Sequence, residues 1–266
     1  MDGVLQIGPV VIPTARALAL ALFWAFVAIG AAVAVRIESN ASRISWIALL
    51  VGLVAARLGY VAANFSAFMI EPASIVAFWQ GGFLAWPGIA AAAAVIAMSL
   101  GRSRAGVVML ATLGALSAIH VATYTLLAPD ARPMPPGIAL ADLNGRWTEL
   151  DHAEGEPRVI NLWATWCPPC RREMPMVMDV AKQSTVPVLL ANQGESVGQI
   201  RAYLAGEGLS DDGILTDPGG LLGEATGSPA LPTTLFVDGD GNIARIHTGE
   251  ISRAALTAAI RDLERN

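Results

Sequence analysis

Long apolar segments fill the first half of the chain and stop near residue 128. A helix that spans a membrane needs about 20 mostly apolar residues. Four segments meet this description, at about 17–35, 44–65, 81–100 and 105–127. Beyond residue 138 the apolar runs are short and alternate with polar segments, as in strands and helices that pack in water. The pattern predicts a multi-domain chain, with an all-α region of four transmembrane helices at residues 1–128 and an α/β domain at residues 138–266.

A proline-rich segment joins these two regions. Four of the ten residues from Ala128 to Gly137 are proline. Proline blocks the continuation of a helix and stiffens an extended chain. We therefore expect residues 129–137 to form a linker between the two domains.

The second half alternates predicted strands with predicted helices. The elements expected, in order, are strand 158–164, helix 167–182, strand 186–191, helix 197–205, strands 235–238 and 243–248, and a final helix to about residue 265. Residues 239–242 (Gly-Asp-Gly-Asn) predict the turn of a terminal hairpin, and Ser252 predicts the cap of the last helix. Alternation followed by a hairpin is typical of an α/β or α+β sandwich.

The two regions also differ in charge. Residues 1–128 contain no Lys, six Arg and three acids, a balance of +3, whereas residues 129–266 carry −8, which gives the overall charge of −5. The first half is suited to lipid and the second to water. Neither half has the clustered Lys and Arg that attract nucleic acid, so nucleic acid is excluded as a partner.

Arginines in the short loops predict the orientation of the membrane region. Arg36 and Arg43 lie between the first and second predicted helices, and Arg102 and Arg104 lie between the third and fourth. Because basic loops are retained in the cytoplasm, both ends of this region should face the opposite side. We therefore expect a multi-pass protein of a bacterial inner membrane whose C-terminal domain is periplasmic, that is, extracytoplasmic.

The candidate chemistry lies in the two cysteines of the chain, Cys167 and Cys170. A zinc site would need two further Cys or His ligands, and the sequence offers no second pair, so we expect no metal. At the first turn of a helix, the helix dipole lowers the pKa of a thiol and favours the thiolate. Cys167 is then the catalytic nucleophile that attacks a disulfide, and Cys170 resolves the mixed disulfide.

Several segments of the second half resemble the TlpA/ResA-type branch of the thioredoxin family: VINLWATWCPPCRREMP, GESVGQIRAYL, LTDPGG, LPTTLFVDGDGNI and HTGEIS. The resemblance covers nearly all of residues 135–266. It implies a thioredoxin-like fold and a membrane-anchored, extracytoplasmic thiol–disulfide oxidoreductase, and we expect no cofactor. It also implies that Pro232 is a cis proline beside the dithiol.

The same resemblance implies further site residues. Glu173 matches an acid that this branch keeps near the dithiol, where a carboxylate could shuttle the proton of Cys170; the alternative is a solvated acid on a helix. Asn161 occupies the place of a buried Asp of cytosolic thioredoxins, so it cannot accept that proton. Residues expected at the substrate-binding surface are Trp166, Pro168, Pro169, Leu231 and Thr233.

Part of the first half resembles prolipoprotein diacylglyceryl transferases. The matching segments are Ile7–Pro9, Ala56–Tyr60, Glu71–Pro72 and Trp79–Gly82. Trp86 stands where that family has an essential histidine, and the later spans of the family are missing. The resemblance implies a truncated, degenerate relative that anchors the protein and could still hold lipid.

Arg57 is the one charge inside a predicted span. Charged side chains within a membrane face protein or water and are functional candidates, so Arg57 is a candidate lipid contact. Two alternatives stay open: snorkelling toward the membrane surface, and a structural pairing inside the protein.

Together these features predict a membrane-anchored thiol–disulfide oxidoreductase that reduces disulfides in exported proteins through its CPPC dithiol. Residues 1–166 contain no cysteine, so electrons would come from a separate membrane reductase. The alternative is a lipoprotein-maturation protein that binds phospholipid, such as phosphatidylglycerol from the lipid bilayer, and whose thioredoxin-like domain reduces a client cysteine.

Overall fold

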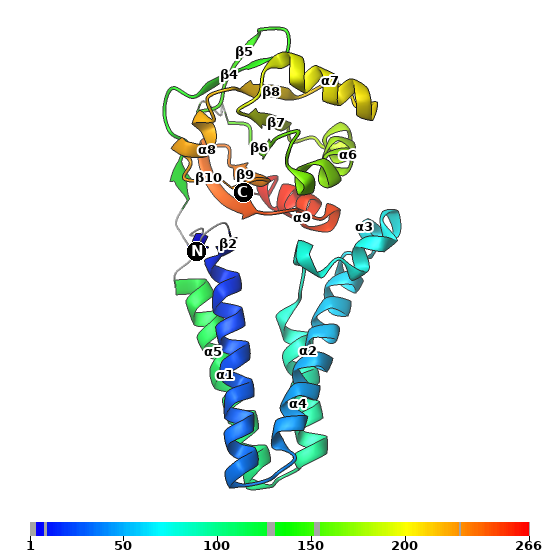
Figure 1. The fold of residues 1–266 in the computed structure, drawn as a ribbon, viewed down its shortest axis with the longest axis vertical. Coiled ribbons are helices and arrows are strands. Elements are labelled where there is room, and N and C mark those ends of the chain that lie inside the picture. Colours follow the sequence, from blue (N-terminus) through cyan, green and yellow to red (C-terminus); the bar gives the residue numbers. More distant parts are fainter. Residues whose placement is uncertain (1–3, 8–9, 127–130, 152–154, 229, 266) are drawn as a thin grey trace. The chain divides into compact units, whose positions relative to one another are not determined.

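The computed structural model describes residues 4–7, 10–126, 131–151, 155–228 and 230–265 (Figure 1). The chain forms two compact units. The first unit comprises Met1–Ile75 and Gly82–Pro129, and the second comprises Val76–Gly81 together with Asp130–Asn266. The domain boundary expected at residues 128–129 lies outside the described residues.

Helices make up most of the first unit, after a short antiparallel hairpin of β1 (Val4–Ile7) and β2 (Val10–Pro13). The helices are α1 (Thr14–Arg36), α2 (Ala41–Ala63), α3 (Phe65–Ile70), α4 (Ala85–Leu100) and α5 (Arg104–Leu126). Two short 3-10 turns, η1 (Pro72–Val76) and η2 (Phe78–Gln80), lie between α3 and α4 in the sequence.

Within the described residues, three helical segments are long and apolar enough to cross a membrane: Arg16–Arg36, Ala41–Ala63 and Arg104–Thr123. The span expected at 81–100 needs correction, because α4 begins only at Ala85 and has 16 residues. Gly81 and Gly82 adopt φ angles of 75° and 78°, a conformation that glycine accepts readily and that a regular helix excludes. The predicted third span is therefore a shorter apolar helix.

Small residues allow α2 and α4 to pack closely. A Cβ atom on Gly88 would lie 2.7 Å from the carbonyl oxygen of Gly52, and one on Gly52 would lie 3.0 Å from that of Gly88. Ala56 and Ala92 flank this contact and are buried. Close backbone approach through small residues is a common way for helices to associate in lipid. The outer face of α2 keeps apolar side chains such as Leu50 exposed.

An eight-stranded sheet forms the centre of the second unit, in the order β3-β10-β9-β6-β7-β8-β4-β5. Its strands are β3 (Arg132–Pro133), β4 (Ala139–Asp142), β5 (Trp147–Glu149), β6 (Arg158–Trp163), β7 (Val188–Gln193), β8 (Ile214–Asp217), β9 (Thr233–Val237) and β10 (Asn242–Thr248). Its helices are α6 (Pro168–Gln183), α7 (Val197–Glu207), α8 (Leu221–Ala225) and α9 (Arg253–Leu263). Strands β6, β7 and β8 are parallel neighbours, whereas β9 and β10 pair antiparallel on the other side of β6 (Figure 1).

Strand β6 contributes to two apolar cores. Val159 and Trp163 pack in a cluster with side chains of α6, α7 and α9, and Ile160 and Leu162 pack in a second cluster with side chains of β4 and α8. The alternation follows from the two-residue repeat of a strand, and burial on both faces explains why its sequence is almost entirely apolar. Asn161 shares the face of Val159 and Trp163, so this polar side chain points toward α6.

Most elements predicted for this unit are confirmed, including the Ser252 cap, whose hydroxyl oxygen accepts the Ala255 N–H over 3.2 Å. The linker prediction for 129–137 needs correction. Arg132 pairs with Ile243 of β10, and Met134 is 4% exposed in the second core. Residues 132–134 therefore belong to the domain rather than to a linker.

Candidate active site

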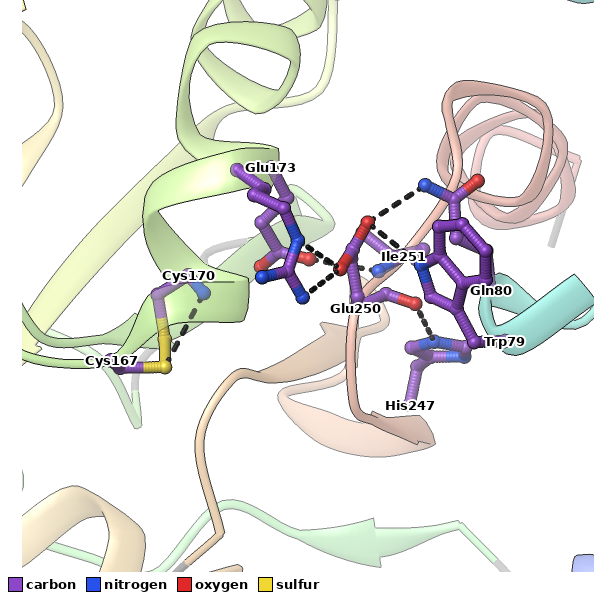
Figure 2. Close-up of polar contacts among 9 residues, drawn as sticks. Trp79, Gln80, Cys167, Cys170, Glu173, His247, Glu250 and Ile251 are labelled. Atoms are coloured by element: carbon purple, nitrogen blue, oxygen red, sulfur yellow. Dashed lines mark hydrogen bonds and ion pairs between the residues drawn. A yellow bond between two sulfur atoms is a disulfide. The ribbon is translucent and has the colours of Figure 1, made fainter. Parts of the chain in front are cut away.

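The dithiol lies where β6 passes into α6. Cys167 is the N-cap of α6, and Pro168 and Pro169 occupy its first turn, where the missing N–H of proline costs little. Cys167 and Cys170 are joined by a disulfide. The Cys170 N–H donates to Cys167 Sγ over 3.3 Å (Figure 2). The N-terminal end of α6 is thus directed at the Cys167 sulfur.

The surroundings of the two sulfur atoms differ in exposure. Cys167 is 3% exposed and Cys170 is fully buried, whereas the adjacent Trp166 is 68% exposed. Pro168 is also exposed. Exposed aromatic side chains are frequent anchors of protein contacts. The recessed dithiol thus lies beside an apolar surface that a partner protein could cover.

Of the other residues expected at the substrate surface, Pro169 and Leu231 are half-buried, and Leu231 packs against the apolar cluster that contains both cysteines. Thr233 is different: it is fully buried, and its hydroxyl donates to the Ala230 carbonyl over 2.7 Å. The prediction that Thr233 binds substrate is therefore corrected for its side chain, which has no access to a partner.

The Leu231–Pro232 peptide bond is cis, as the sequence resemblance implied. Pro232 is buried immediately before β9, and its carbonyl accepts the Gly249 N–H over 2.8 Å. Two residues on, the Thr234 hydroxyl oxygen accepts from Asn161 Nδ2 over 3.1 Å. This segment is therefore tied both to the turn after β10 and to β6.

Glu173 lies three residues after Cys170, on the same face of α6, and is only 3% exposed. Asn161 Nδ2 donates to its Oε1 over 2.9 Å, and the Ile251 N–H donates to its Oε2 over 2.8 Å. The alternative of a solvated helix acid does not match this structure. Glu173 is instead a buried carboxyl of α6 that Asn161 of β6 and Ile251, in the segment before α9, hold in place; Figure 2 shows the Ile251 contact.

Burial raises the pKa of Glu173 from an ordinary value of 4.5 to about 7, because removal from water disfavours the carboxylate. Hydrogen bonds from Ile251 and Asn161 oppose this rise by stabilising the charged form. The nearby charge of Glu250 raises the pKa of Glu173 further, and Arg172 lowers it. The carboxyl can therefore gain or lose a proton near neutral pH.

A second buried carboxylate, which the sequence analysis missed, holds the loop before the dithiol. Glu195 is 5% exposed. It accepts the Thr165 N–H over 2.7 Å, the Thr165 hydroxyl, and Asn192 Nδ2 over 2.8 Å. Thr165 lies two residues before Cys167, so Glu195 fixes the backbone that leads into α6. No local pattern links these residues, which are 30 positions apart.

In the first unit, Arg57 is 2% exposed. Its Nε and Nη1 donate to the carbonyls of Ile75 and Gly82, both over 2.9 Å, and its Nη2 donates to the Ser74 carbonyl. The guanidinium also lies over the Phe68 ring, 5.3 Å from its centroid. Arg57 thus makes the structural pairing, and the candidate lipid contact is corrected because the side chain is enclosed by protein.

Gly82, the last residue of the Trp79–Gly82 segment, lies against Tyr60 and Arg57. A Cβ atom on Gly82 would lie 2.5 Å from the Tyr60 ring and 2.9 Å from Arg57 Nη1. Only glycine fits there, and its φ of 78° also requires glycine. In the first matching segment, Gly8 and Pro9 lie outside the described residues.

The comparisons with known proteins concern the second unit. The family model described as Redoxin matches residues 127–260. The chain is similar to the thiol-disulfide oxidoreductase ResA of Halalkalibacterium halodurans, with 35% identity over 113 residues, 41% of this chain and 64% of that protein. It is 30% identical over 130 residues to the thiol:disulfide interchange protein HelX of Rhodobacter capsulatus, covering 48% of this chain and 73% of that protein.

One solved structure is reported for comparison. The pneumococcal exposed lipoprotein thioredoxin Etrx1 from Streptococcus pneumoniae is 25% identical, with a TM-score of 0.42, and the match covers 47% of this chain and 98% of that chain. The fold and the dithiol define the second unit as a thioredoxin-like domain of the disulfide oxidoreductase class. The chain belongs to the Redoxin family. The transferase resemblance of the first half stays a prediction.

Proposed function

We propose that this protein is a membrane-anchored thiol–disulfide oxidoreductase that reduces disulfides in exported proteins. The observation that carries the proposal is the placement of Cys167 at the N-cap of α6, with the Cys170 N–H directed at its sulfur. This placement makes Cys167 the better nucleophile, while Cys170 is buried one turn further along.

The reaction proceeds by two thiol–disulfide exchanges. In the first, the Cys167 thiolate attacks one sulfur of the client disulfide, forming a mixed disulfide and releasing one client thiolate. In the second, the Cys170 thiolate attacks Cys167 Sγ, which releases the other client thiolate and forms the Cys167–Cys170 disulfide. The client gains two electrons, and the dithiol loses two. The disulfide form described here is the product of that reaction.

Glu173 supports the second exchange as a proton acceptor. Cys170 attacks as a thiolate, so its proton must leave, and a fully buried thiol has little access to water. The Glu173 carboxyl is on the same face of α6, and its pKa of about 7 suits a group that accepts a proton near neutral pH. Asn161, which donates to Glu173, holds the carboxyl in place.

The membrane region supports the proposed location. Three helices of the described residues could cross a membrane, and α4 is a shorter apolar helix. With the shorter helix as a fourth span, the arginine-rich loops face the cytoplasm and the dithiol domain is extracytoplasmic, at a bacterial inner membrane. The oxidised dithiol is then returned to the reduced state by dithiol exchange with a separate membrane reductase.

Trapping the mixed disulfide tests this function. The full-length Cys170→Ala variant, mixed with a fluorescent peptide that contains an intramolecular disulfide, should accumulate a covalent adduct that reductant releases. The matched Cys167→Ser variant should form none. An adduct on Cys167→Ser, or the absence of an adduct on Cys170→Ala, would contradict the assignment of nucleophile and resolving cysteine.

A further inference from the structure

A turn from the sequence between α3 and α4 belongs to the unit that carries the dithiol. The η2 turn, Phe78–Gln80, lies within Val76–Gly81, which forms part of the second compact unit. Trp79 Nε1 and Gln80 Nε2 both donate to Glu250 Oε1, over 3.4 Å and 2.8 Å (Figure 2). The resemblance to thioredoxin-like proteins, which covers residues 135–266, does not include this turn.

Glu250 connects the turn to the active-site helix. Its second oxygen, Oε2, accepts from Arg172 Nε over 3.1 Å and from Arg172 Nη2 over 2.8 Å. The side chain of Glu250 is only 8% exposed. One carboxylate therefore receives four donor groups from two segments, the η2 turn and α6, and hydrogen bonds to a charged acceptor of this kind are among the stronger ones in proteins.

The backbone on either side of Glu250 contacts the redox site. Gly249 donates its N–H to the carbonyl of Pro232 over 2.8 Å. Ile251 donates its N–H to Glu173 Oε2, also over 2.8 Å. The Glu250 side chain and these two N–H groups belong to one three-residue stretch of backbone, so contacts that fix Glu250 also restrict the backbone that donates to Pro232 and Glu173. The position of Glu250 therefore bears on the hydrogen bonding of Glu173.

We propose that Glu250 is a positioning residue for Glu173, and that the Trp79–Gln80 turn is the clamp that holds Glu250 in place. This inference rests on the proposed role of Glu173 as proton acceptor for Cys170. Through Glu250 and Glu173, the Trp79–Gln80 turn, which lies outside the residues that the Redoxin model matches, would then influence the attack of Cys170 on Cys167. A change at the clamp would alter the rate at which Cys170 completes the reaction without touching either sulfur atom.

Several charged or titratable groups lie on the elements packed against Glu173, namely Cys167, Cys170, Arg172, Asp179, His247, Glu250 and Arg253. Arg253 is paired with Asp179, and His247 Nε2 lies 3.3 Å from the Glu250 carbonyl oxygen. Glu250 is the anion of this set that raises the pKa of Glu173. Its neutralisation would also free Arg172 from its ion pair, and both effects favour the charged form of Glu173.

The pH profile of the reaction tests the positioning role in the full-length protein. The rate of peptide disulfide reduction should show a step that depends on Glu173, and Glu250→Gln should move its midpoint to lower pH by about half a unit or more. Glu207→Gln is the matched control. It also removes one negative charge, from an exposed ion pair with Arg171, which lies on α6 next to Arg172. Equal midpoints for the two variants would overturn the positioning role.

Cross-linking tests the clamp without any redox activity. In a background of Cys167→Ser and Cys170→Ser, Gln80→Cys combined with Glu250→Cys should be joined by a short bismaleimide cross-linker, because the ends of the two native side chains are in contact, whereas Gln80→Cys combined with Glu207→Cys should not. Failure of the first pair would overturn the clamp. If Glu173→Gln has the same pH profile as the wild type, Glu173 is not the proton acceptor and Glu250 cannot act by positioning it. The cross-link then still decides whether the Trp79–Gln80 turn contacts Glu250.

Discussion

Asn161 Nδ2 lies 2.9 Å from Glu173 Oε1, between β6 and α6. The two residues are 2% and 3% exposed. An amide can donate to a carboxylate but cannot take its proton, so the titrating group at this place is Glu173. The pair thereby keeps an ionisable carboxyl fixed three residues after the buried Cys170 in α6, and away from bulk water.

The stability of the protein should depend on pH through Glu173. Its pKa is about 7 in the fold against an ordinary value of 4.5. A carboxyl with a raised pKa stabilises the fold fully below its unfolded pKa, and that contribution is lost as the pH rises through the folded pKa. In the wild type, the free energy of unfolding should therefore fall by up to about 3 kcal/mol as the pH rises through this range. In Glu173→Gln, which has no carboxyl at this position, that decrease should be absent. Denaturant unfolding of the oxidised wild type and of oxidised Glu173→Gln, at pH 4.5 and above pH 7, measures this difference. The same pH dependence of the unfolding free energy in both proteins would contradict the buried carboxyl.

The loop before the dithiol should depend on Glu195. In Glu195→Ala, the Thr165 N–H and the Asn192 amide lose their acceptor inside the protein, which we expect to cost about 1–3 kcal/mol of unfolding free energy and to slow peptide reduction. Glu224→Ala, on the exposed side of α8, is the control and should change stability by less than about 0.5 kcal/mol. If Glu195→Ala has the same free energy of unfolding as Glu224→Ala, the contacts of Glu195 do not contribute to stability.

The contact between α2 and α4 should tolerate no added methyl group. In Gly88→Ala, the new Cβ would lie 2.7 Å from the backbone oxygen of Gly52, so the helices must separate, at a cost of about 1–3 kcal/mol. Gly114→Ala is the matched control in α5, where a Cβ meets nothing within 4 Å and alanine gains up to about 1 kcal/mol of helix propensity. Thermal unfolding in detergent compares the two; a stabilised Gly88→Ala protein would refute the close packing.

Replacing Arg57 should lower the stability of the protein and leave its lipid binding unchanged. Arg57→Met removes the donor from the half-buried carbonyls of Ile75, Gly82 and Ser74, which should cost about 3 kcal/mol in total. Phosphatidylglycerol bound to the purified protein should be unchanged relative to Arg104→Met, an exposed control. Loss of bound phosphatidylglycerol from Arg57→Met without a loss of thermal stability would restore the lipid-binding alternative.

Local patterns in the sequence were sufficient for the centre of the redox domain. The apolar run of β6 and the cap at Ser252 are short-range signals, and the structure confirms both. The CPPC spacing likewise identified Cys167 and Cys170 before the fold was known. These features depend on residues within one or two helical turns of each other, so a reading of the chain could find them.

Features that depend on distant parts of the chain were missed. Strands β4 and β8 are short, and they pair with each other across 75 positions of the sequence. The contact of Gln80 with Glu250 joins positions 170 residues apart, and nothing near Gln80 indicates it. Thr233 was expected at the surface because it follows Pro232, whereas strand pairing on both sides buries it.

The Cys167–Cys170 dithiol is proposed to work as a reductant, and its reduction potential decides whether it can. The chain has no other cysteine, so the full-length protein can be equilibrated in glutathione or dithiothreitol buffers and its free thiols read by alkylation. A reductant of this kind should have a potential near or below about −230 mV, on the thioredoxin side of the known range. A potential near about −120 mV, where strong oxidants lie, would contradict it and make the protein a disulfide donor.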